Sequence, residues 1–336
     1  MTEDTRPLMV SVRCTVYNHE PYLRQCLDGF VMQKTNFRFE AIVHDDASTD
    51  GSAEIIKEYA KKYPNIIKPI YETENQWSKK DGSLARIMNE ACKGKYVALC
   101  EGDDYWTDCN KLQKQVDYLE MHDDCSMVCS KASLFSETRN CIIGQKACYS
   151  QSQELVPQDV IIKGGLFIPT CSTVIRNEIL DNYPDYCVKC HVGDFPRHIY
   201  CVMRGKGYYM NDAMSVYRVE NPNSWVGRNL NAKTTAGRLA DMLSEVLMLQ
   251  GFKADYPQYS ETFDERIFIY LRFNIPSRNK DAKGHKMFSN IFEEEIKSLN
   301  RRKRFAILLA SSNFSFLLRY YERVEHFIQR HGFCVN

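Results

Sequence analysis

The stretch Lys95-Tyr-Val-Ala-Leu-Cys-Glu-Gly-Asp-Asp-Tyr-Trp106 decides how the rest of the sequence is interpreted. The apolar run 96–100 is typical of a buried strand, and the acidic run Glu101-Gly-Asp-Asp104 follows it directly. The three carboxylates of this run repel one another unless a positive charge lies among them. A hard divalent cation relieves that repulsion, and such an ion usually also holds phosphate oxygens. The stretch therefore predicts a strand that ends at a metal and diphosphate site.

Size and composition limit the class of protein. The chain has 336 residues, enough for one full domain and an addition, and its 44 Lys and Arg nearly balance its 43 Asp and Glu. This balance provides no basic field that would recruit nucleic acid. We expect neither an export leader nor a membrane span, since no apolar run reaches ~18 residues. The 14 cysteines then indicate a reducing compartment, and we expect a cytoplasmic protein.

Segments typical of strands and helices alternate over the first half of the chain. The apolar runs with the length of strands are 9–17, 39–43, 66–71, 96–100 and 127–135. The segments between them carry apolar stripes at helical spacing. This alternation predicts an α/β fold with a mostly parallel mixed sheet flanked by helices. The polar, irregular stretch 140–159 favours a loop over the sheet.

The composition changes after Asn221-Pro222, where two further short strands, 207–210 and 214–219, have ended. From about Ala236 the sequence carries helical stripes. We therefore expect one domain over residues 1–222 and a helical C-terminal extension over residues 223–336.

Acidic pairs follow two of the expected strands. Asp45 and Asp46 follow the second, as Asp103 and Asp104 follow the fourth. In parallel sheets ligands bind beyond the carboxyl ends of the strands. A single acidic pair is more often a turn or a helix cap, so Asp45 and Asp46 alone are equally consistent with stabilising the helix that starts after Gly51. Two pairs at one edge favour a shared site.

In combination, several short motifs resemble the family 2 glycosyltransferases of the GT-A fold, which is Rossmann-like. The resemblance covers about residues 8–220 and depends on the stretches Val16-Tyr-Asn-His19, 42–52, Ala85-Arg-Ile-Met-Asn89, Gly94-Lys-Tyr96, 101–104, Thr170-Cys-Ser172 and Gly193-Asp194. It implies an inverting, metal-dependent hexosyl- or N-acetylhexosaminyltransferase. The donor would be a nucleotide-diphosphate sugar, UDP-linked, and the acceptor a hydroxyl of a glycan or lipid-linked glycan in surface polysaccharide assembly.

The resemblance implies roles for residues on the donor side. Asp46 would accept a hydrogen bond from the uracil-type base, and Asp103 would face the ribose. Asp104 would ligate the Mn²⁺ or Mg²⁺ ion that bridges the diphosphate. Tyr17 and Arg86 would line the nucleotide pocket. Arg86 is also consistent with a solvated helix charge, and Asp104 with a cap of the helix that follows it.

On the acceptor side, Asp194 would be the general base that takes the proton of the acceptor hydroxyl. Gly-Asp is also a common turn pair. The sequence departs from the family at Glu220, where many relatives have a histidine that helps to hold the metal. This departure puts a third protein ligand in doubt, so that Asp104 would hold the ion with phosphates and waters, as Mg²⁺ and Mn²⁺ commonly accept.

Two other functions fit parts of this pattern. A sugar nucleotidyltransferase is also α/β and metal-dependent, but it needs a glycine-rich phosphate loop after the first strand. Tyr17-Asn-His-Glu20 supplies no such loop. A non-catalytic sugar-nucleotide binding module would bind the donor without turnover.

The end of the chain leaves three alternatives open. Arg301-Arg-Lys-Arg304 precedes an apolar, helix-like segment, 305–327. A basic and apolar helix can lie on an anionic membrane surface, which would make the protein peripheral at the inner face of the membrane. The segment is equally consistent with a helical cap over the catalytic domain or a contact in a homo-oligomer, with the basic cluster solvated.

Overall fold

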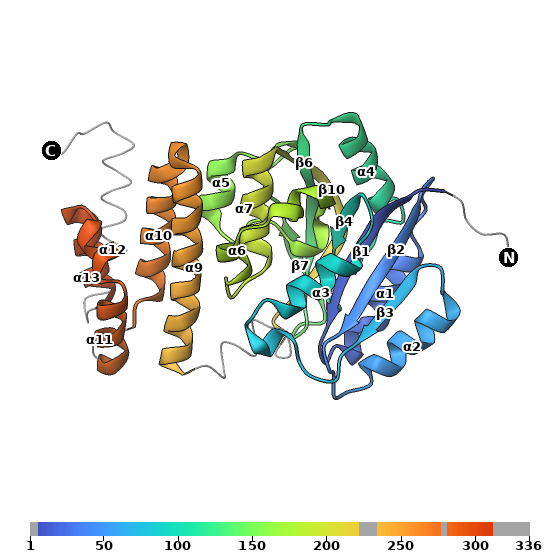
Figure 1. The fold of residues 1–336 in the computed structure, drawn as a ribbon, viewed down its shortest axis with the longest axis horizontal. Coiled ribbons are helices and arrows are strands. Elements are labelled where there is room, and N and C mark those ends of the chain that lie inside the picture. Colours follow the sequence, from blue (N-terminus) through green and yellow to red (C-terminus); the bar gives the residue numbers. More distant parts are fainter. Residues whose placement is uncertain (1–5, 222–233, 277–280, 312–336) are drawn as a thin grey trace. The chain divides into compact units, whose positions relative to one another are not determined.

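The computed structural model describes residues 6–221, 234–276 and 281–311. The chain forms two compact units, residues 1–232 and 233–336 (Figure 1). The expected domain boundary at residue 222 falls beside a stretch that lies outside the described residues, and it stays a prediction.

The described residues of the first unit form a ten-stranded mixed sheet with the order β3-β2-β1-β4-β9-β6-β10-β5, where β7 also pairs with β6 and β8 with β10. The strands are β1 (Leu8–Val16), β2 (Arg38–Asp45), β3 (Ile67–Tyr71), β4 (Tyr96–Leu99), β5 (Tyr105–Trp106), β6 (Cys125–Ser136), β7 (Cys141–Lys146), β8 (Gln153–Glu154), β9 (Val174–Arg176) and β10 (Lys206–Val219). β1 is parallel to β2 and β4, and β6 to β10, whereas β9 is antiparallel to both of its neighbours. The predicted α/β fold with a mostly parallel mixed sheet is confirmed.

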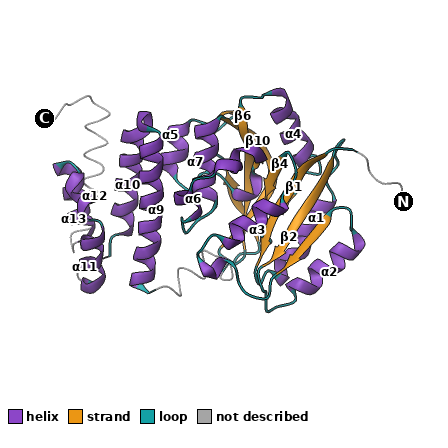
Figure 2. Ribbon diagram, viewed as in Figure 1, coloured by secondary structure: helices purple, strands orange, loops and turns teal. Residues whose placement is uncertain are grey.

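Helices cover both faces of this sheet (Figure 2). The helices of the first unit are α1 (Glu20–Val31), α2 (Ser52–Lys62), α3 (Ser83–Ala91), α4 (Lys111–Met121), α5 (Pro157–Lys163), α6 (Asp185–Val188) and α7 (Asp194–Arg204). Successive side chains of a strand point to opposite faces. Val12 and Cys14 of β1 therefore share a core with Leu27 of α1, while Arg13 points the other way and donates to Asn89 of α3 at 2.5 Å.

The first two helices start beside one another. The two carboxylate oxygens of Asp50 accept hydrogen bonds from the backbone N–H groups of Glu20 and Ser52, each at 3.0 Å. Asp50 therefore stabilises the start of α2. This is the alternative role that the sequence left open for Asp45 and Asp46.

The prediction of a loop over residues 140–159 was wrong. β7 pairs antiparallel to β6 in this stretch, β8 follows, and α5 begins at Pro157. Residues 141–145 of β7 are all exposed, so this strand needs no apolar alternation and gives no signal in the sequence. The two short strands expected at 207–210 and 214–219 are one strand, β10, whose pairing with β6 shifts register between Met210 and Ser215.

The described part of the second unit is helical, as predicted. Its helices are α9 (Thr235–Asp255), α10 (Ser260–Asn274), α11 (Ala282–Ile291), α12 (Glu293–Ser298) and α13 (Arg301–Ser311). The predicted stripe of α9 is buried at Leu239, Met242 and Val246. The basic cluster opens α13, and the apolar segment beyond residue 311 lies outside the described residues. Within the described ranges, no helix combines the length and the hydropathy that a membrane span requires.

Candidate active site

The two acidic pairs come together at the end of β1. The N–H of Asp46 donates to the carbonyl of Val16 at 2.9 Å, and the N–H of Gly102 donates to that of Thr15 at 3.0 Å. A Cβ atom at Gly102 would lie 2.9 Å from Val16 Cγ2 and 2.8 Å from His19 Nδ1. Any larger residue at position 102 would therefore push the acidic turn away from the sheet.

Asp104 is buried at this turn, with 4% of its surface exposed. Its Oδ1 accepts a hydrogen bond from the backbone N–H of Arg218 at 2.8 Å. Burial raises the pKa of Asp104 well above its usual range, and the charge of Asp103 raises it further. Because its pKa is raised, the ionised form of this buried carboxylate is stabilised by any cation that replaces the proton. Asp108, and not Asp104, supports the backbone that leads into α4, because its Oδ1 accepts from the N–H of Asn110 at 2.8 Å.

The Arg218 side chain fixes β10 beside Asp104. Its guanidinium lies 5.0 Å from the ring centres of Tyr22 and Tyr105 and 5.2 Å from that of Phe135. It also forms an ion pair with Glu137. Contacts with α1, β5 and β6 together hold the backbone group that orients the Asp104 carboxylate.

Glu101 links the acidic turn to two arginines. Withdrawal from bulk water, together with the charges of Asp103 and Asp194, raises the pKa of Glu101 to about 8 against the opposing effect of Arg197 and Arg13. Glu101 keeps an exposed surface, so repulsion by the two aspartates is an important cause of this shift in pKa. The same interactions show that Asp194 lies within reach of the turn after β4.

Asp194 is the first residue of α7. Its Oδ2 accepts from the Thr170 hydroxyl at 2.9 Å and its Oδ1 from the N–H of Phe195 at 2.7 Å. A negative charge is also favoured at a helix N-terminus. The carboxylate is half-buried and held by two donors, an arrangement that suits a base of fixed orientation better than an exposed turn residue.

Tyr217 lies where the acidic groups converge. Burial raises its pKa strongly, and Asp104, Glu101 and Asp194 add to the rise. The Lys146 ammonium lies 5.3 Å from the centre of the Tyr217 ring. Tyr217 is therefore within electrostatic reach of both the predicted metal ligand and the predicted base.

Asp46 has a different immediate environment. Its Oδ1 accepts from the N–H of Gln76 at 2.6 Å and its Oδ2 from the N–H of Trp77 at 3.1 Å. It thereby fixes the turn that follows β3, at the edge of the sheet where β2 ends. Each carboxylate oxygen retains a second lone pair, and the role of Asp46 toward a base stays a prediction.

The other predicted donor-side residues lie at or near this edge. Tyr17 directly follows β1 and is half-buried, and Asp103 is half-buried between Glu101 and Asp104. Arg86 is exposed on α3, where its charge helps to lower the pKa of Asp81. The structure does not bring Arg86 into the cluster around Tyr217, and the roles of all three stay predictions.

The chemistry of the turn after β4 suits a hard cation. Its side-chain donors are carboxylate oxygens, the ligands that Mg²⁺ and Mn²⁺ prefer, and a divalent ion would remove the repulsion that raises the pKa of Asp104. In the described part of the chain, no three His, Cys, Asp or Glu side chains form a complete ligand set. Glu220 is exposed and accepts a hydrogen bond from the Ser136 hydroxyl. These residues fit an ion whose shell is completed by phosphates and water.

Several charged residues of the site gave no usable signal in the sequence. Arg13 lies inside an apolar strand, Lys146 in a stretch without periodicity, and Tyr217 in a strand whose inner face was not assigned. Arg197, in contrast, is three residues after Asp194 on one helix, a spacing that places two side chains on one face. Arg197 is 9% exposed, and its Nε has no hydrogen-bond partner in the described residues.

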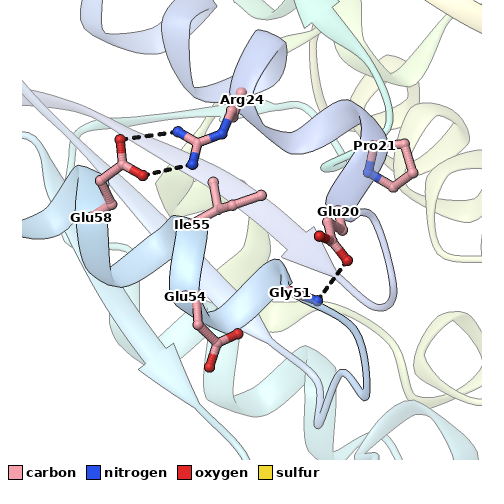
Figure 3. Close-up of a pocket in the computed structure, with 7 residues that line it drawn as sticks. All are labelled: Glu20, Pro21, Arg24, Gly51, Glu54, Ile55 and Glu58. Carbon is pink, nitrogen blue, oxygen red and sulfur yellow. Dashed lines mark hydrogen bonds and ion pairs between the residues drawn. The ribbon is translucent and has the colours of Figure 1, made fainter.

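A pocket of about 610 Å³ lies outside this cluster, between α1 and α2 (Figure 3). Its lining includes Glu20, Glu54 and an Arg24–Glu58 ion pair at 2.6 Å. None of the predicted site residues contributes to it.

His198 on α7 predicts how stability depends on pH. Burial lowers its pKa from 6.5 to about 4. Below pH 6.5 His198 is therefore protonated in the unfolded chain, while in the folded protein it stays neutral down to about pH 4. The free energy of unfolding that comes from this difference is lost as pH falls from 6.5 to 4. At ~1.4 kcal/mol per pKa unit the loss is on the order of 3 kcal/mol. Urea unfolding at pH 7.0 and 4.5 should show a larger loss in the wild type than in His198→Gln. The exposed His122→Gln serves as control, and equal losses in wild type and His198→Gln would contradict the assignment.

Comparison with known proteins gives the family. The sequence profile described as Glycosyl transferase family 2 matches residues 11–183, just over half of the chain. An uncharacterized protein, Rv1520 of Mycobacterium tuberculosis, is 35% identical over 228 residues, which are 64% of this chain and 60% of that protein. The poly(ribitol-phosphate) beta-glucosyltransferase of Bacillus spizizenii is 35% identical over 102 residues, 29% of this chain and 15% of that protein. The match thus spans less than two thirds of the length of either relative.

Two solved structures share the fold. Staphylococcus aureus TarS 1-349 in complex with UDP-GlcNAc has a TM-score of 0.64 at 16% identity, covering 98% of this chain and 93% of that one. The mannosyltransferase PcManGT of Pyrobaculum calidifontis, in complex with GDP-Man and Mn²⁺, has a TM-score of 0.54 at 16% identity, covering 95% and 83%. The chain therefore belongs to glycosyl transferase family 2, and its sheet has the GT-A fold that the sequence predicted.

Proposed function

We propose that this protein is an inverting, metal-dependent glycosyltransferase that moves a hexosyl or N-acetylhexosaminyl group from a UDP-sugar to a hydroxyl of a glycan or lipid-linked acceptor. We place the reaction in surface polysaccharide assembly, in the cytoplasm. The observation that carries the proposal is that Asp104 and Asp194 both act electrostatically on the buried Tyr217 of β10. A leaving diphosphate and an attacking hydroxyl need these two groups on opposite sides of one anomeric carbon.

Asp194 supplies the base. An alcohol is a weak nucleophile at neutral pH, so a carboxylate must accept its proton as the new bond forms, which contributes about 10²–10⁴-fold. Thr170 and the N–H of Phe195 hold the carboxylate in one orientation. A single base and a single displacement invert the anomeric carbon, and no second nucleophilic carboxylate is required.

Asp104 would hold the divalent ion. When bound, that ion supplies Lewis acidity at the diphosphate. The N–H of Arg218 orients the Asp104 carboxylate, and burial keeps it from bulk water. The Mn²⁺ and GDP-Man in PcManGT and the UDP-GlcNAc in TarS support an ion and a nucleotide sugar in this fold. We assign Tyr17, Asp46, Arg86 and Asp103 to the nucleotide pocket.

The function is tested by the product that is released. With Mn²⁺ and a panel of UDP- and GDP-sugars, we expect UDP release from a UDP-sugar, slow with water as acceptor and faster with glycan acceptors. UTP with sugar 1-phosphates should give no pyrophosphate. Pyrophosphate release would instead identify a nucleotidyltransferase. Metal-dependent protection of the protein against thermal unfolding by a donor that is never turned over would identify a binding module.

A further inference from the structure

Lys146 is placed in the site without a polar partner. It is the last residue of β7, opposite Ala132 of β6, and it is half-buried. Its ammonium lies 5.3 Å from the centre of the Tyr217 ring. Within the described ranges, no hydrogen bond or ion pair forms at this ammonium, although it carries three N–H donors.

Two other ring-contacting lysines of the first unit, Lys111 and Lys163, have a polar acceptor as well as a ring. The ammonium of Lys111 is 4.4 Å from the Trp106 ring centre and donates to Gln115 Oε1 at 2.6 Å. The ammonium of Lys163 is 5.3 Å from the Tyr149 ring centre and pairs with Asp159 at 3.3 Å. A ring contact therefore does not replace an acceptor at these lysines, and Lys146 has donors available for a ligand.

The charges near Lys146 belong to both halves of the site. Burial lowers its pKa, and Asp194 and Asp104 are among the groups that oppose the change. The Lys146 ammonium thus lies over the Tyr217 ring and within electrostatic reach of both the residue assigned to the acceptor proton and the residue assigned to the metal. An anion that enters this space could accept charge-assisted hydrogen bonds from the Lys146 ammonium.

We propose that Lys146 binds the diphosphate of the nucleotide-sugar donor. This inference rests on the proposed function, because the diphosphate is the anion that the reaction must bring to Asp104. In the transfer the bond between the anomeric carbon and the diphosphate oxygen breaks, and both electrons leave with the nucleoside diphosphate. The acceptor oxygen forms the new bond and its proton passes to Asp194. Lys146 keeps its proton and donates hydrogen bonds to the oxygens on which charge develops.

The test compares the affinity of UDP with that of uridine, which lacks the phosphates. In calorimetric titrations with Mn²⁺ present, Lys146→Met and Lys146→Gln should lower the affinity for UDP by about 10–100-fold, the range for a charge-assisted hydrogen bond. Lys146→Arg should retain UDP affinity to within about threefold, because the charge and the donors remain. Uridine affinity should be the same in every variant. Lys163→Met is the matched control, since it removes a ring-contacting lysine outside the cluster.

The outcomes separate the inference from the function. If the wild type binds no UDP with Mn²⁺, the proposed function itself fails. If the wild type binds UDP and both neutral variants bind it equally well, the inference about Lys146 is overturned and the function stands. If the neutral variants lower the affinity for uridine as much as that for UDP, Lys146 is a structural residue and the inference is again overturned. The same holds if the neutral variants unfold at a markedly lower temperature than Lys146→Arg.

Discussion

Asp194→Asn should transfer sugar about 10²–10⁴-fold more slowly than the wild type while its affinity for UDP is unchanged. The amide has the size of the carboxylate and can still accept from Thr170, but it cannot take a proton from the acceptor hydroxyl. Initial rates of UDP release at saturating donor, together with calorimetric UDP titration, measure both quantities.

Asp185→Asn is a matched control for this variant. Asp185 is the first residue of α6, as Asp194 is of α7, and its side chain is 90% exposed. The control should keep the wild-type rate. A near-wild-type rate in Asp194→Asn would eliminate Asp194 as the base.

The second large effect is expected at Asp104. Asp104→Ala should remove the dependence of UDP binding on Mn²⁺, because the variant lacks the buried carboxylate of the acidic turn. We expect Mn²⁺ affinity to fall by more than about 100-fold, beyond the effect of losing a residue that only supports a ligand. UDP titration across a series of Mn²⁺ concentrations measures this directly.

Asp108→Ala controls for the general loss of an acid near α4. Asp108 stabilises the start of that helix and pairs with Lys114 at 2.7 Å, so its loss should lower stability and leave the Mn²⁺ dependence intact. Undiminished Mn²⁺-dependent UDP binding in Asp104→Ala would refute its role as ligand.

The central sheet could be predicted because its strands are buried on both faces. β1, β2 and β4 consist largely of buried residues, so each appears in the sequence as an apolar run with polar residues at its end. β7 could not be predicted, because its residues are exposed and it is held by backbone pairing to β6 alone. A periodic hydrophobic pattern arises where one face of an element is buried. An exposed strand at the border of a sheet therefore shows no such pattern.

The candidate site also contains residues that could be predicted from the sequence and residues that could not. Asp104 and Asp194 were predicted through motifs of the family, and both lie within electrostatic reach of Tyr217, while their roles stay predictions. The cations near them could not be predicted from the sequence. Arg13 and Lys146 belong to separate strands and reach the site only because β1 pairs with β4 and β7 pairs with β6. The hydrogen bonds of Asp46 to residues 76–77 depend equally on a loop conformation that composition does not encode.

The attachment of β7 has an evolutionary consequence. Residues 141–145 are exposed and contribute no side chain to the core, so insertions or substitutions there leave the main sheet intact. If Lys146 binds the donor, the affinity for nucleotide sugars could change during evolution through substitutions in one hairpin. The part of the fold that carries the base and the metal ligand would stay unchanged.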